Sequence, residues 1–223
     1  MGKKFLLISS LFLLLVTACK PKNERFISEG EIEYDAFVMD RENPMASLAP
    51  DKMTIKFKDD KICFEMNAGM GLFTTSFISD PPKKSITQLV KFLNKKFMLT
   101  QSREDVIKEN ENCGLEVIPT NETKLIAGYL CKKVKIKPKK KNEAEYAIYY
   151  TNELDVKKPN FINCYNMIDG VLMEYQMKKF GLEMKFTAQK VKNIEIDSKV
   201  FEIPSDYKKV TEKEMKAFFN DLN

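Results

Sequence analysis

Residues 53–66 read MTIKFKDDKICFEM, and this stretch decides the fold class. Apolar Met53, Ile55 and Phe57 alternate with polar residues, and the same period-two alternation resumes at residues 62–66. Such alternation places one face of a strand against a core and the other face in solvent. Because the polar residues between the two runs interrupt the pattern as a turn does, the stretch predicts a β-hairpin.

Patterns of the same kind continue on both sides of the hairpin. We expect further strands over residues 29–40, 72–79, 115–118, 129–137, 145–151, 172–179 and 182–196. Residues 85–99 are ambiguous, because their first four residues (SITQ) resemble a helical capping box. Phe92, Phe97 and the turn-like residues 94–96 instead suit a hairpin, and we predict strand–turn–strand there. The chain is therefore predicted to be mainly β, with about ten strands.

Two helices are predicted among these strands. Residues 102–112 begin with a serine N-cap candidate and have acidic residues in the first turn. Near the C-terminus, Thr211 and Glu214 have the spacing of a capping box. Val210 and Met215 have the spacing of a hydrophobic staple. Apolar residues then recur at helical spacing, so we expect this C-terminal helix to pack its apolar face on the sheet.

The N-terminus predicts export and lipid attachment. Lys3 and Lys4 precede an apolar run over residues 5–16, and the sequence VTAC at residues 16–19 places small residues before Cys19. This arrangement resembles the lipobox of bacterial lipoproteins, whose cysteine carries acyl chains such as palmitate. The predicted regions are a cleaved lipoprotein signal peptide at 1–18, a lipidated N-terminus and tether at 19–28, and a single β-rich domain at 29–223.

Two other interpretations of this N-terminus are open. An uncleaved anchor must cross a hydrocarbon core of ~30 Å, whereas residues 5–18 span only about 21 Å as a helix. An ordinary secretory signal would be cleaved at the same small residues but would not account for Cys19. Lipid attachment at Cys19 predicts a cell-envelope protein exported across the inner membrane. In similar lipoproteins an aspartate after the cysteine retains the protein in the inner membrane, so Lys20 favours the outer membrane.

Composition narrows the classes of function. The chain has 43% hydrophobic and 31% charged residues, a balance typical of soluble globular domains. It has no histidine, which excludes Ser-His-Asp and Cys-His catalytic sites and histidine-ligated zinc. The formal net charge of +5 is too small to indicate binding to nucleic acid. Acidic pairs such as Glu31 with Glu33 are expected to face solvent, and we predict no catalytic residue, no metal site, no cofactor and no enzymatic activity.

Cysteines beyond Cys19 are the remaining candidates for covalent chemistry. Export to an oxidising compartment permits two disulfides among four cysteines, with three connectivities. No Cys-x-x-Cys pair is present, so a zinc or redox site is not indicated. Cys63 and Cys131 lie within apolar strand patterns and are alternatively free buried thiols. If one bridge forms, we favour Cys113 with Cys131, which closes the shortest loop.

Several segments resemble a Gram-negative envelope lipoprotein family of uncharacterised function. The segments are residues 53–66, residues 77–99 with the basic-aromatic step Lys95-Lys96-Phe97, residues 120–134 (TNETKLIAGYLCKKV), which are the most specific, and residues 201–207 (FEIPSDY). The resemblance implies a fold similar to the periplasmic lipoprotein carriers (LolA/LolB-like). In that fold a curved antiparallel sheet or half-barrel is covered by a few short helices around an apolar cavity. The family has no catalytic residues to carry over.

Two functions are predicted for a membrane-anchored lipoprotein of this mainly β (α+β) class. The first is non-enzymatic binding of lipid or another apolar ligand in the cell envelope. The alternative is a structural or assembly role, in which the outer surface docks a partner protein in the envelope. The alternative predicts a packed interior and an exposed apolar or charged patch. The volume of any internal pocket therefore distinguishes the two.

Overall fold

The computed structural model describes residues 27–43, 46, 49–80, 85–140, 143–179 and 182–221. The predicted signal peptide at 1–18 and most of the predicted tether, including Cys19, lie outside the described residues. Within the described ranges, no helix is long and apolar enough to cross a bilayer.

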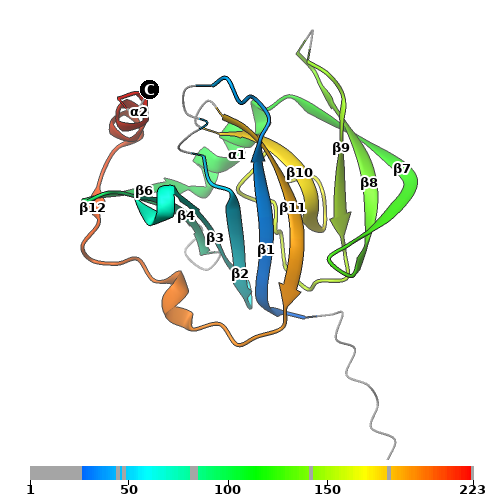
Figure 1. Cartoon of the computed structure of the whole chain (residues 1–223), viewed down its shortest axis with the longest axis horizontal. Helices are drawn as coiled ribbons and strands as arrows, with labels where there is room; N and C mark the ends of the chain where they lie inside the picture. The colour runs from blue at the N-terminus through cyan, green and yellow to red at the C-terminus, as the bar shows by residue number, and fades with distance from the viewer. Residues whose placement is uncertain are drawn as a thin grey trace, which may run out of the picture.

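Twelve strands in the described part of the chain form one open, curved sheet (Figure 1). Their order is β12-β6-β5-β4-β3-β2-β1-β11-β10-β9-β8-β7, and neighbours are antiparallel except β12 with β6. The strands are β1 (Glu29–Val38), β2 (Lys52–Lys58), β3 (Lys61–Ala68), β4 (Phe73–Asp80), β5 (Ser85–Phe92), β6 (Lys95–Ser102), β7 (Leu115–Ile126), β8 (Tyr129–Pro138), β9 (Tyr146–Thr151), β10 (Val171–Lys179), β11 (Leu182–Lys192) and β12 (Lys208–Lys209). The helices are α1 (Arg103–Glu111), α2 (Glu212–Asn220) and the short 3-10 helices η2 (Gly69–Gly71) and η3 (Ser198–Phe201). The mainly β prediction is confirmed, with twelve strands where about ten were expected.

The hairpin that decided the fold class forms as predicted. β2 and β3 pair in antiparallel register, with Met53 opposite Met66 and Phe57 opposite Ile62. The turn between them includes Asp59, which has a φ of 53°. Aspartate tolerates this left-handed conformation better than most residues, because its short side chain can hydrogen-bond locally. The polar residues therefore supply the turn, and the alternating apolar residues share one face.

The ambiguous stretch is also a hairpin, as predicted, since β5 and β6 pair along their whole length. Its apolar residues have helix-like spacing because both faces of β5 are buried. Leu89 packs with Ile196 on one face, and Val90 packs with Met215 of α2 on the other. Strand alternation disappears when a sheet is covered on both faces.

Both predicted helices form, and each begins with a capping box. The hydroxyls of Ser102 and Thr211 each accept a hydrogen bond from the backbone N–H three residues further on. Val210 and Met215, the predicted hydrophobic staple, are both buried in one apolar cluster. Local sequence signals therefore placed both helix N-termini correctly.

The strand β7 is longer than expected, because the alternation predicted only residues 115–118. It is an edge strand, so it pairs only with β8, and most of its second half is exposed. Its register shifts between Pro119 and Thr123. Backbone hydrogen bonds to β8 stabilise this edge strand even though it has no apolar face. The polar residues that protect a sheet edge from further pairing also weaken the apolar–polar alternation in the sequence.

Both faces of the sheet are covered by other parts of the chain. We call the face that carries Tyr34, Phe57 and Tyr175 the inner face. Residues 152–170, which connect β9 to β10, pack into its main core; their buried apolar residues are Leu154, Tyr165 and Ile168. α2 lies on the inner face of β4, β5 and β6, and residues 193–207 cover the outer face of β3 to β5. α1 packs against β5 and β6.

The two ends of the sheet differ in what they carry. The described chain enters the sheet at Glu29, beside the turn at residues 59–60, because Glu29 pairs with Lys58. We call this the tether end. β1 ends at the opposite edge, where η2 and the turn at residues 93–94 lie, and we call this the far end. The antiparallel register thus separates the N-terminal entry point from η2 by the length of the strands.

Candidate functional site

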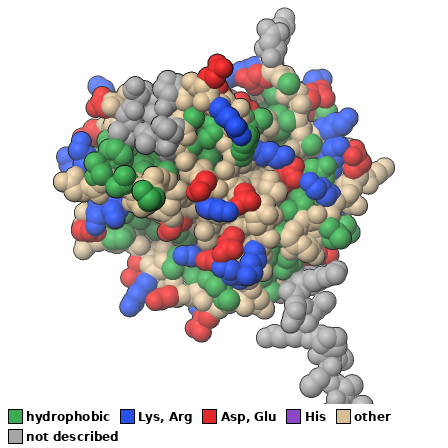
Figure 2. Space-filling model, viewed as in Figure 1, with side chains coloured by type: hydrophobic (Ala, Val, Ile, Leu, Met, Phe, Trp, Pro, Cys, Tyr) green, Lys and Arg blue, Asp and Glu red, His purple; other side chains and the backbone are tan. Residues whose placement is uncertain are grey.

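Large hydrophobic side chains are exposed at the far end of the sheet. Met70 is fully exposed, and Leu72 and Leu93 are each 54% exposed. The two turns that carry them are neighbours, because the backbone N–H of Leu93 donates to the carbonyl of Leu72 over 2.8 Å. Figure 2 shows hydrophobic side chains gathered over η2. We call Met70, Leu72 and Leu93 the far-end knob.

The backbone of the far-end knob is also in an unfavourable conformation. Met70 has a φ of 54° between Gly69 and Gly71, which also have positive φ, and Leu93 has a φ of 54°. A residue with a Cβ in this conformation costs roughly 1–2 kcal/mol, and turns of this kind favour Gly, Asn or Asp. The apolar side chains of Met70 and Leu93 make no favourable interaction with water that would offset this conformational free energy. Exposed apolar residues on strained turns make the far-end knob a candidate contact surface.

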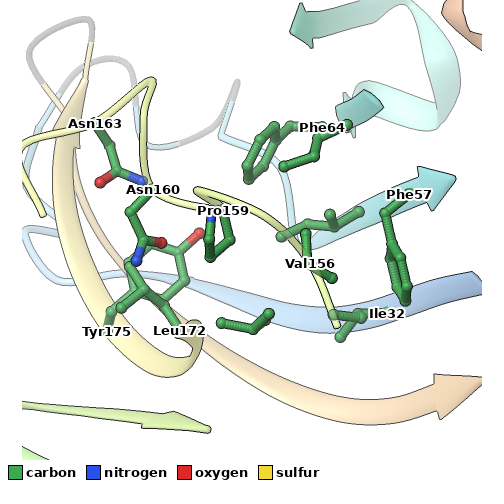
Figure 3. A pocket seen from close by; sticks show the side chains of 12 residues that line it. Ile32, Phe57, Phe64, Val156, Pro159, Asn160, Asn163, Leu172 and Tyr175 are labelled. Atoms are coloured by element: carbon green, nitrogen blue, oxygen red, sulfur yellow. The ribbon is translucent and has the colours of Figure 1, made fainter. Parts of the chain in front are cut away.

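Two cavities among the described residues lie in the apolar interior, and both are small. A cavity against the inner face has a volume of about 10 Å³ (Figure 3). It is lined by Ile32, Ile55, Phe57, Ile62, Phe64, Val156, Pro159, Asn160, Asn163, Val171, Leu172 and Tyr175. A second cavity, between β2–β4, β10 and the 152–170 segment, has about 30 Å³. These volumes are the space of roughly one to three waters, because one water needs about 10–15 Å³.

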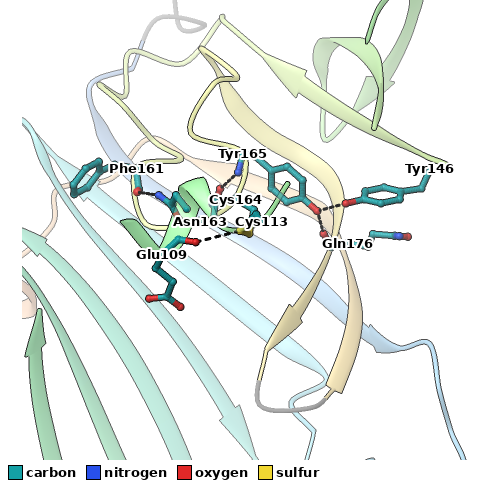
Figure 4. Close-up of a disulfide and its surroundings, with 9 residues drawn as sticks. Glu109, Cys113, Tyr146, Phe161, Asn163, Cys164, Tyr165 and Gln176 are labelled. Atoms are coloured by element: carbon teal, nitrogen blue, oxygen red, sulfur yellow. Dashed lines mark hydrogen bonds between the residues drawn. A yellow bond between two sulfur atoms is a disulfide. The ribbon is translucent and has the colours of Figure 1, made fainter. Parts of the chain in front are cut away.

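The predicted bridge between Cys113 and Cys131 is wrong. Cys113, just after α1, is bonded to Cys164 in the 152–170 segment (Figure 4). Cys131 lies on β8 with its side chain fully buried in the core, where it cannot reach an exposed helix end. Loop length was a poor guide, since the sheet separates residues that are close in sequence and brings distant ones together.

The disulfide is one of several links that fix the 152–170 segment over the inner face. The side-chain amide of Asn110 on α1 donates to the carbonyl of Phe161 over 2.8 Å. Within the segment, the side-chain amide of Asn160 donates to the carbonyls of Ile168 and Gly170 over 2.7 and 2.8 Å, which fixes its own fold. The hydroxyl of Tyr165 donates to the carbonyl of Gln176 on β10 (Figure 4). The segment is therefore a fixed part of the core.

The other two cysteines are free buried thiols, which confirms the alternative prediction for them. Burial raises the pKa of the Cys63 thiol to about 12 and that of Cys131 to about 11. Because the thiolate is the nucleophile, both thiols are inert near neutral pH. Both act as small apolar side chains in the core.

A third cavity lies at the tether end, and seven of its nine lining residues are charged or polar. It has a volume of about 100 Å³. Its lining residues come from five separate segments: Asp60, Ile62, Ser79, Asp80, Ser85, Arg103, Lys157, Lys158 and Phe161. The Asp60 carboxylate is 3.2 Å from Lys157 Nζ, and the Arg103 guanidinium lies 5.7 Å from the centre of the Phe161 ring. We call this cavity the tether-end pocket.

Two acidic pairs, Glu31 with Glu33 and Glu212 with Glu214, serve local structure. Glu31 and Glu33 both bind Lys192 Nζ, Glu31 over 2.8 Å. The carboxylate of Glu214 completes the capping box of α2, and that of Glu212 pairs with Lys216. No group of three or more potential metal ligands occurs among the described residues.

Comparison with known proteins bears on the fold. No protein-family model matches the sequence, and no curated protein matches it. Two crystal structures of PNGF-II are similar: one has a TM-score of 0.55 and 18% identity over 86% of this chain, the other 0.52 and 17% over 86%. These alignments cover 33% and 32% of the PNGF-II chain, so this chain spans about a third of that protein's length. At this identity the likeness concerns the fold alone, and the lipoprotein-carrier resemblance stays a prediction.

Sequence reasoning missed both the far-end knob and the tether-end pocket. The knob had one signal in the sequence, a methionine between two glycines at residues 69–71. The pocket had none, because its residues come from five segments that only the folded sheet brings together. Of the predicted site residues, Cys19 lies outside the described residues, and Cys113 and Cys131 lie in different environments.

Proposed function

We propose that the chain is a lipid-anchored envelope protein that docks a partner protein through the far-end knob. The observation that carries this proposal is the exposure of Met70, Leu72 and Leu93 on adjacent strained turns. The small volumes of the two apolar cavities among the described residues, about 10 and 30 Å³, support it as well. An exposed patch above a packed core is what an assembly role requires.

The position of the tether favours a protein partner over the anchoring membrane. An extended chain from residue 19 to residue 27 reaches about 28 Å. β1 alone has ten residues and is about 33 Å long. The tether is therefore too short to fold back along the sheet, and the knob points away from the membrane that holds Cys19. A protein with an apolar groove is the occupant that fits this geometry.

Lipid binding inside the domain, the first function predicted from the sequence, has less support. A half-barrel carrier must enclose its ligand, and ligand pockets typically have about 300–1,000 Å³. The 152–170 segment occupies the inner face that such a ligand would need. The docking role is therefore the better interpretation of a membrane-anchored lipoprotein.

Anchoring is tested at Cys19. In cells fed labelled palmitate, we expect label in the wild-type chain and none in Cys19→Ser, because only the thiol forms the thioether to the lipid. Globomycin, which blocks the lipoprotein signal peptidase, should make the wild-type precursor accumulate. Unchanged processing in both treatments would remove the anchor from the proposal. Cys63→Ser is the matched control, because that thiol is buried and should leave labelling intact.

Docking is tested by photo-crosslinking in intact cells. A benzophenone-bearing amino acid at Leu72 should give one discrete adduct, and the same probe at Leu125, 69% exposed in the second half of β7, should not. With the probe at Leu72, Leu93→Ser should lower the yield about tenfold, because one buried leucine contributes about 1.5–3 kcal/mol. Leu125→Ser is the matched control. Equal adducts at both positions, or full yield with Leu93→Ser, would count against docking.

A further inference from the structure

The tether-end pocket faces the membrane in the proposed arrangement. Asp60 lies in the turn beside the start of β1, and Asp80 and Ser85 close the same end of β4 and β5. The described chain enters the sheet at this end, so a lipid at Cys19 would place the pocket toward the lipid head groups. This step rests on the proposed anchoring.

The charges around the pocket are of both signs. Arg103, Lys157 and Lys158 line it together with Asp60 and Asp80, an excess of one positive charge. Lys157 is paired with Asp60, while Lys158 has no salt bridge to any described residue. Arginine presents a planar fork of donors that matches phosphate oxygens. The Asp60 and Asp80 carboxylates also line this pocket, and carboxylates suit an ammonium group.

The pocket also has a matching size and apolar surface. About 100 Å³ holds roughly seven to ten water-sized groups, at about 10–15 Å³ each. Phosphoethanolamine has a similar number of non-hydrogen atoms. Phe161 and Ile62 supply apolar contacts for its short carbon chain, and Ser79 and Ser85 supply hydroxyls for its phosphate.

We propose that the tether-end pocket binds a phosphate ester that carries a primary ammonium, with Arg103 and Lys158 at the phosphate and Asp60 and Asp80 at the ammonium. At this end of the molecule the source is the phosphoethanolamine head group of the anchoring membrane. Binding holds the tether end on the membrane and turns the far-end knob outward, toward a partner.

The test uses the mature chain, residues 19–223 with Cys19→Ser, so that no acyl chain contributes. Titration with soluble phosphoethanolamine, followed by NMR, should shift amides of Ser79, Ser85 and Arg103. We expect Arg103→Gln to weaken binding about tenfold or more, because a charge-assisted bond to phosphate contributes about 1.5–3 kcal/mol. Lys139→Gln, an exposed lysine at the far end, is the matched control and should bind as wild type. Absence of binding, or equal affinity of Arg103→Gln, would overturn the site.

A vesicle arm identifies the source of the ligand. Phosphatidylethanolamine vesicles should sediment more protein than phosphatidylcholine vesicles, because a trimethylated ammonium cannot donate hydrogen bonds to Asp60 and Asp80. Binding to soluble phosphoethanolamine without this preference would overturn the lipid source. The crosslinking experiment at Leu72 is independent of this test. If phosphoethanolamine binds but the Leu72 probe gives no adduct, the docking proposal alone is contradicted. If the adduct forms but phosphoethanolamine does not bind, the head-group site alone is contradicted.

Discussion

Replacing Cys113 and Cys164 together by serine is expected to lower the free energy of unfolding by about 4 kcal/mol. The bridge closes a loop with a sequence separation of 51, and a loop of this length gives that value from the chain entropy of the unfolded state. It also fixes the 152–170 segment to the end of α1, so its loss should loosen the cover of the inner face. Urea unfolding of the oxidised proteins, followed by circular dichroism, measures the difference.

Reduction provides the matched control for this change. A reductant should destabilise the wild-type protein by a similar amount and leave the double serine variant unaffected, because the two remaining thiols are free in both. Peptide mapping without reduction should recover Cys113 joined to Cys164. A double variant that unfolds at the wild-type urea concentration, or a mapped bond from Cys113 to Cys131, would contradict the assignment.

The strands could be predicted from the sequence wherever one face is buried and the other is exposed. The alternation at residues 53–66 placed β2, β3 and their turn within one or two residues. The prediction of strands failed where a strand does not have one buried face and one exposed face. β7 is stabilised by pairing at an edge and needs no apolar face, and β12 has only two residues. Capping boxes are local, so both helix N-termini were correct.

The candidate sites depended on long-range packing and could not be predicted in the same way. Loop length favoured Cys131 as the partner of Cys113, whereas the observed partner is Cys164, because connectivity is set by how the 152–170 segment folds back on α1. Met70 and Leu93 lie in the turns that join β3 to β4 and β5 to β6, where strand periodicity makes no prediction of exposure. Periodicity reports burial along one element and carries no information on which elements meet.

Tyr34→Ala is expected to lower the free energy of unfolding by about 3–5 kcal/mol, as for other large aromatic residues deleted from a core. Tyr34 is fully buried at the centre of the sheet, and its ring meets the Tyr175 ring edge-on at 6.2 Å. Its hydroxyl donates to the carbonyl of Leu172 over 2.8 Å, where the register of β9 with β10 is irregular. Burial raises the pKa of this hydroxyl well above its usual value, so it stays a neutral donor.

Tyr34→Phe separates the ring from the hydroxyl. It keeps the packing and leaves a buried carbonyl without this donor, so we expect a loss of about 1–3 kcal/mol. Tyr149→Phe removes a hydroxyl that makes no hydrogen bond to the described residues, and it should change stability by less than about 0.5 kcal/mol. Urea unfolding of all three variants gives the comparison. If Tyr34→Phe were as stable as wild type, the bond from Tyr34 to Leu172 would contribute nothing, and ring packing alone would join β1 to β10 across β11.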